Sequence, residues 1–108
     1  MELERTSFVL RIAQEDYEDY VERHRHVYPE LLKAFGETGI ATYSIFYHEG
    51  LLFNYLEAEN VAETMDQLTA YPVYARWQEY MSDMLLKNEA GKVSTDIPEV
   101  FHFKTKRE

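Results

Sequence analysis

Apolar and polar residues alternate near the N-terminus of the chain, in the pattern of a half-buried β-strand. In residues 7–12 every second side chain is apolar: Phe8, Leu10 and Ile12. Residues 41–48 and 51–57 are rich in the aromatic and β-branched side chains that strands favour, and Glu49–Gly50 between them is typical of a two-residue hairpin turn. The pattern therefore predicts one strand near the N-terminus and a β-hairpin in the middle of the chain.

Between these strands the spacing of apolar residues changes to that of an α-helix. At about 100° per residue, one side of the helix carries the following residues: Tyr17, Tyr20, Val21, His24, Tyr28, Leu31, Leu32 and Phe35. The pattern predicts a helix over residues 14–26. Pro29 has no backbone N–H and disfavours helical geometry at Tyr28, so we expect a break near Val27 and a second helical piece from Pro29 to Gly36.

A second helical segment follows the hairpin and is interrupted in the same way. Asn60 is a favourable N-cap, and Tyr71–Pro72 divides the segment into two pieces. Their apolar stripes contain Val61, Met65 and Leu68 in the first piece, and Val73, Trp77, Tyr80, Met81 and Met84 in the second. Residues 87–98 are rich in Gly, Asn, Ser and Asp and predict a loop, and residues 100–103 predict a last strand.

The predicted order of elements is strand, helix, strand, strand, helix, strand. This order indicates an α+β, ferredoxin-like βαββαβ fold, in which a four-stranded antiparallel sheet has two helices on one face. We expect residues 1–108 to form a single domain, with flexible ends at 1–6 and 104–108. The other sheet face would also carry large apolar side chains, so we expect it to pack against a second copy of the chain or to enclose a small ligand.

Composition excludes several classes of partner. The net charge of -9 disfavours binding to nucleic acid or to anionic lipid, because phosphate surfaces would repel the protein. No apolar run approaches the roughly 18 residues of a membrane span, and residues 1–6 lack the apolar stretch of a signal peptide, so a cytoplasmic location is expected. There is no Cys, which leaves only His and carboxylate side chains as metal ligands.

One face of the first helix combines an imidazole with phenols. Tyr20, His24 and Tyr28 are spaced four residues apart, so they lie one above another on the helix. A His side chain titrates near neutral pH and is therefore suited to general acid–base chemistry, while phenol hydroxyls can orient a substrate or relay a proton. This face is the candidate catalytic surface.

Structural explanations exist for the same residues. A single His on an apolar helix face is more often a core residue with a satisfied hydrogen bond than a catalytic group, and Tyr or Trp side chains often serve only in packing. For Tyr28 packing is the preferred interpretation. A metal site at His24, His26 and Glu30 is a further alternative, although residues two apart diverge on a helix. His48 and His102 are expected to be exposed.

The order and spacing of several segments resemble the L-rhamnose mutarotase family of sugar 1-epimerases. The matching segments are 20–24, 28–31, 43–46, 52–57, 76–77, 80–83 and 99–102, within a resemblance that covers residues 8–103. The resemblance implies a dimeric ferredoxin-like α/β barrel that interconverts the α and β anomers of L-rhamnose without a cofactor or metal. It also implies that His24 is the proton donor and that Tyr20, Tyr43 and Trp77 contact the sugar.

The chain departs from the family pattern at two places. The family commonly has Asn-Pro after the catalytic His and a second Trp after the first, whereas this chain has Arg25–His26 and Gln78. Because the second Trp contacts substrate in the family, Gln78 is a candidate substrate-binding residue. An amide offers more hydrogen bonds than an indole, so the pocket is predicted to accept a more hydroxylated pyranose than a 6-deoxy sugar.

The sequence thus supports an aldose mutarotase, an isomerase that binds a monosaccharide and works as a cytoplasmic homodimer. Two alternatives remain open at this stage. One is a monooxygenase or haem-degrading protein with the same dimeric α/β barrel architecture, since one fold hosts unrelated chemistries. The other is a domain that binds a small ligand without catalysis.

Overall fold

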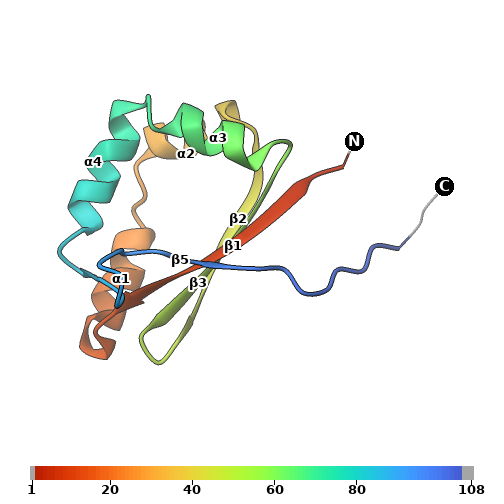
Figure 1. Ribbon diagram of the computed structural model, residues 1–108. Helices are drawn as coiled ribbons and strands as arrows, with labels where there is room; N and C mark the ends of the chain where they lie inside the picture. Colours follow the sequence, from red (N-terminus) through yellow and green to blue (C-terminus); the bar gives the residue numbers. More distant parts are fainter. Residues whose placement is uncertain (1, 106–108) are drawn as a thin grey trace.

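The computed structural model describes residues 2–105 and contains one curled antiparallel sheet (Figure 1). Its three long strands are β1 (Glu4–Ile12), β2 (Ile40–His48) and β3 (Leu51–Ala58), in the order β2-β3-β1. The hairpin between β2 and β3 turns at Glu49 and Gly50, whose φ angles are 44° and 87°. Two successive positive φ angles define the hairpin turn whose twist matches the strands, which confirms the predicted hairpin.

The fourth position of the sheet is filled by two short strands. Both β4 (Leu85–Leu86) and β5 (Thr95–Ile97) pair antiparallel with β1, on the edge that does not face β3. The ferredoxin-like order is therefore kept, but the predicted loop over residues 87–98 contains β5. Residues 87–94 leave the edge between the two strands. Arg11 pairs with Leu86 at the end of β4, and Val9 pairs with Thr95 at the start of β5, nine residues further along the chain.

The predicted strand at residues 100–103 is wrong. This segment is an extended arm that runs beyond the sheet (Figure 1). Its apolar side chains are highly exposed: Val100 by 93%, Phe101 by 80% and Phe103 by 72%. Residue types that favour a strand also favour any extended segment. On this edge of β1, β4 and β5 pair with residues 11–12 and 7–9, and the arm continues past them without pairing.

Both helical segments are divided where the sequence predicts. The first begins as a 3-10 turn, η1 (Gln14–Asp16), continues as α1 (Tyr17–His24) and restarts as α2 (Pro29–Glu37). The second consists of α3 (Val61–Leu68) and α4 (Pro72–Met81). In both restarts proline occupies the first helical turn, where no intrahelical bond needs its missing N–H.

The chain ends differ in part from expectation. Residues 4–6, which fall in the N-terminal segment 1–6 predicted to be flexible, belong to β1 and pair with β3 from Glu4↔Ala58 onward. Lys104 and Thr105 have no regular secondary structure, and residues 106–108 of the predicted flexible tail lie outside the described part of the chain.

All four α-helices lie on the concave side of the sheet, as Figure 1 shows. Ile12 of β1 and Leu52 of β3 pack against the helical side of the protein. With Tyr20, Met81 and Met84 they form a first core cluster. A second cluster lies between the helices and contains Leu31, Ala34, Leu68 and Val73. Trp77 contacts both clusters, and it therefore stands at the boundary between the two halves of the core. His48 and His102 are exposed, as predicted.

The two adjacent leucines of α2 provide a test of this packing. Leu31 is 1% exposed and Leu32 is 56% exposed. Replacing Leu31 with Ala should lower the free energy of unfolding by about 2–5 kcal/mol, because it leaves a cavity in the core. Leu32→Ala should cost less than about 1 kcal/mol, as for most exposed positions. Chemical denaturation of both variants measures the difference, and equal losses would contradict the packing described here.

Candidate functional site

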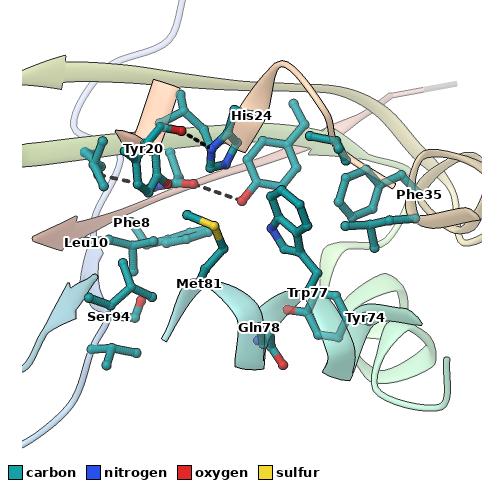
Figure 2. A pocket seen from close by; sticks show the side chains of 18 of the residues that line it. Phe8, Leu10, Tyr20, His24, Phe35, Tyr74, Trp77, Gln78, Met81 and Ser94 are labelled. Atoms are coloured by element: carbon teal, nitrogen blue, oxygen red, sulfur yellow. Dashed lines mark hydrogen bonds between the residues drawn. The ribbon is translucent and has the colours of Figure 1, made fainter. Parts of the chain in front are cut away.

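A cavity of about 1220 Å3 lies between the concave sheet face and the helices (Figure 2). Its wall combines side chains from the sheet strands β1, β2 and β3 with side chains from α1, α2 and α4. Most of the sheet-side wall is apolar, including Phe8, Leu10 and Leu52. The polar groups of His24, Tyr20 and Tyr43 meet in the same cavity, so the structure brings together three of the predicted site residues.

His24 stands at the C-terminal end of α1 and is half-buried. Its Nδ1 lies 2.9 Å from the backbone carbonyl oxygen of Tyr20. A carbonyl oxygen can only accept, so Nδ1 carries the proton and donates it, and the neutral ring keeps its free lone pair on Nε2. Burial lowers the pKa of His24 below its usual 6.5, which the bond to the carbonyl only partly offsets. The imidazole is therefore neutral at pH 7 and can accept a proton at Nε2.

Tyr20 packs against the face of this imidazole. The two ring centroids are 4.3 Å apart and the ring planes differ by 27°. Burial raises the pKa of Tyr20 to about 12, so its phenol stays protonated. Among the described residues, 2–105, its hydroxyl has no hydrogen-bond partner, which leaves it available to a molecule in the cavity.

Trp77 forms the opposite wall from α4. Its indole meets His24 edge-on, with centroids 5.3 Å apart and planes at 89°. Tyr28 packs edge-on against the same indole at 5.1 Å, so Tyr28 supports the wall, as its packing interpretation predicts. Figure 2 shows the indole of Trp77 directed into the space beside His24. An aromatic plate in this position can stack on the C–H face of a sugar ring.

Tyr43 lines the cavity from β2. Its hydroxyl donates to Oδ1 of Asn54 on β3 at 2.9 Å, and Asn54 is fully buried. Burial is the main cause that raises the pKa of Tyr43, with smaller contributions from the phenols of Tyr20 and Tyr74. Tyr43 is therefore a neutral phenol at every physiological pH.

Gln78 is not brought together with the other predicted site residues. It borders the cavity but is exposed, and Figure 2 shows that its amide points away from His24 and Trp77. The second departure from the family pattern also lies on the surface. Arg25 and His26 are exposed, and both bind the carboxylate of Glu22, at 2.9 Å and 3.0 Å.

Three residues of the site were missed from the sequence. Asn54 interrupts an apolar strand, which was the available signal. Tyr74 lies three residues before Trp77 and so on the same side of α4, and it lines the cavity. Arg23 joins α1 to the end of α4 through Asp83, at 2.9 Å and 3.2 Å, and through the carbonyl oxygen of Tyr80 at 2.7 Å. No sequence signal links Arg23 to a residue sixty positions away.

The alternative metal site at His24, His26 and Glu30 does not form. His26 binds Glu22 outside the cavity, and Glu30 lies 3.4 Å from Arg76. Within residues 2–105, no group of three or more His, Asp or Glu side chains is placed to hold a metal ion. In the same part of the chain, every helix is too short or too polar to cross a lipid bilayer.

Comparison with known proteins places nearly the whole sequence in one family. A family model described as L-rhamnose mutarotase matches residues 5–103. The L-rhamnose mutarotase of Sinorhizobium fredii is 36% identical over 104 residues, which cover 93% of this chain and 98% of that protein. The L-rhamnose mutarotase of Lactiplantibacillus plantarum is 34% identical over 97 residues, covering 87% of this chain and 92% of its own length.

Solved structures show the same fold. The crystal structure of an L-rhamnose mutarotase from Formosa agariphila has a TM-score of 0.79 at 26% identity and covers 94% of this chain and 99% of its own. A putative antibiotic biosynthesis monooxygenase from Nitrosomonas europaea has a TM-score of 0.63 at 11% identity, a likeness of fold alone, over 88% of this chain and 86% of that one. Since the family model spans nearly the whole sequence and relatives above 30% identity match from end to end, the chain belongs to the L-rhamnose mutarotase family.

Proposed function

We propose that this isomerase interconverts the α and β anomers of L-rhamnose by general acid–base ring opening and closure, with His24 as the catalytic residue. The observation that carries the proposal is the bond between His24 Nδ1 and the carbonyl oxygen of Tyr20. It fixes the ring and leaves Nε2 as a proton acceptor in a cavity large enough for a pyranose. Family membership supplies the substrate.

The reaction needs two proton transfers. Nε2 of His24 takes the proton of the anomeric hydroxyl, the bond between C1 and the ring oxygen breaks, and C1 becomes an aldehyde. The ring oxygen takes a proton from a neighbouring donor. Tyr20 fits that role, because its phenol stays protonated and its hydroxyl has no partner among residues 2–105. Rotation about C1–C2 and the reverse transfers close the ring on either face, so His24 is the proton donor on the return step.

Trp77 and the apolar wall account for binding. The indole supplies a flat surface for the C–H face of the ring, and the apolar side chains from β1 and β3 suit the methyl group of a 6-deoxy sugar. Because the amide of Gln78 is exposed, we propose that it contacts substrate only at the cavity rim and that L-rhamnose remains the first sugar to test. Anomer exchange measured on fully hydroxylated aldoses tests the prediction from the sequence that the pocket accepts a more hydroxylated sugar.

We also propose that the enzyme works as a homodimer. The extended arm at residues 100–103 exposes three large apolar side chains, and Phe46 on the convex sheet face is 66% exposed. Such surfaces are costly in water. In a two-fold arrangement, the arm of each copy would cover the convex face of the other. The cytoplasmic location expected from the sequence stays a prediction.

Substitution of the imidazole tests the mechanism. His24→Gln should lower kcat/KM for anomer exchange by about 10²–10⁴-fold, the usual contribution of general acid–base catalysis, while the fold is kept. Saturation-transfer NMR between the two anomeric protons measures the rate above the spontaneous one. The matched control is His26→Gln, two residues away on the surface. If His24→Gln keeps the wild-type rate, His24 has no catalytic role.

The pH dependence follows from the same environment. Burial disfavours the charged imidazolium, so the pKa of His24 lies below 6.5 and the neutral, active form persists to lower pH. We expect kcat/KM to fall on the acid side with a midpoint below 6.5. An NMR titration of the His24 ring should give the same midpoint and show the proton on Nδ1 above it. A midpoint above 6.5 would contradict this assignment.

Sedimentation at micromolar concentration tests the dimer. The wild-type chain should sediment as a dimer, and the double variant Phe101→Glu, Phe103→Glu should sediment as a monomer, because two charges would be buried at the interface. Leu32→Glu serves as the control, since Leu32 is also apolar and exposed, by 56%, but lies on α2 in the helical layer. A monomeric wild-type chain would end the proposal.

A further inference from the structure

The buried amide of Asn54 is a polar group of the site that has no part in the proposed mechanism. Asn54 lies on β3, on the concave sheet face, where it is paired with Phe8 of β1 and Ile45 of β2. Its exposed fraction is 0%. An amide among apolar neighbours is costly unless its polar atoms are hydrogen-bonded. Both ends of this amide are bonded, at Leu52 and at Tyr43.

These partners determine which way the amide faces. Nδ2 lies 3.2 Å from the carbonyl oxygen of Leu52, and a carbonyl can only accept, so the NH2 group must be on that side. The amide oxygen is then the atom that faces Tyr43, at 2.9 Å. An amide oxygen can only accept as well. The phenol of Tyr43 must therefore donate its single proton to Asn54.

This bond leaves Tyr43 with only one way to bind a ligand. A phenol has one proton and two lone pairs, and the proton is committed to the buried amide. Its oxygen can offer the cavity only lone pairs. We propose that Asn54 is a positioning residue that makes Tyr43 an obligate hydrogen-bond acceptor, so that this wall selects a sugar hydroxyl that donates.

The proposal rests on the proposed function and adds a rule of specificity to it. A hydroxyl at the matching sugar position can donate to Tyr43, whereas fluorine at that position can only accept. The fluorine and the oxygen of Tyr43 are then two acceptors that face each other, and neither has a donor. A lost hydrogen bond of this kind lowers kcat/KM by about tenfold. If Asn54 is removed, the phenol can rotate and donate, and the discrimination should largely disappear.

The test compares L-rhamnose with its 2-, 3- and 4-deoxyfluoro analogues. For each analogue, the ratio of kcat/KM for L-rhamnose to kcat/KM for the analogue is measured in every variant, so that the intrinsic effect of fluorine on the reaction cancels. Each of the three ratios should have the same value in Asn54→Asp as in the wild-type enzyme, because a carboxyl oxygen still accepts the proton of Tyr43. In Asn54→Leu, whose side chain branches at the same carbon but has no hydrogen-bonding atom, one of the three ratios should fall by about tenfold.

Tyr43→Phe and the double variant complete the comparison. Tyr43→Phe should lower the same ratio, and Asn54→Leu should add nothing further in that background, since Asn54 acts through the phenol. Three ratios that are unchanged in a folded Asn54→Leu would overturn the proposal and leave Asn54 with a structural role only. If Asn54→Leu does not fold, a lowered ratio in Asn54→Asp or an unchanged one in Tyr43→Phe overturns it instead. Absence of exchange in the wild-type enzyme with every sugar is a different result and ends the proposed function itself.

Discussion

The site depends on one hydrogen bond between a side chain and its own helix. His24 Nδ1 donates to the carbonyl oxygen of Tyr20 one turn earlier, in the last turn of α1. This bond fixes the ring plane, the tautomer and the direction of Nε2 together. The helix ends directly after His24, because Pro29 requires a new start, and the chain then turns toward α2.

The parts of the structure that follow from local chemistry are those the sequence predicts. Proline positions predict both helix breaks, Glu49–Gly50 predicts the hairpin, and the spacing of Tyr20 and His24 places both rings on one face. The fourth strand is different. Its two pieces are short and polar in part, while the more strand-like residues 100–103 extend past the sheet. The segment that becomes the fourth strand is the one that the chain brings to the edge of β1. Residue type alone does not determine that path.

The site residues that were not identified from the sequence depend on contacts between distant segments of the chain. The bond from Tyr43 to Asn54 depends on strand register, and the ion pair from Arg23 to Asp83 joins segments sixty residues apart. Neither partner is identifiable from its own neighbours in sequence. Yet these contacts determine the shape of the site: the Arg23 bonds hold the end of α4, and with it Trp77, against α1, and Asn54 sets the orientation of a phenol. Long-range polar contacts thus refine a site whose main residues are found locally.

Burial in this cavity shifts the pKa values of the imidazole and the phenol in opposite directions, and both shifts favour the neutral form. It lowers the pKa of His24 and raises the pKa of Tyr20 to about 12, because in both cases it disfavours the charged form. At neutral pH the result is a neutral imidazole, with a free lone pair on Nε2, stacked on a protonated phenol. General acid–base catalysis requires this pair of states, an acceptor and a donor side by side. The apolar walls of the cavity therefore prepare both groups for the proposed proton transfers.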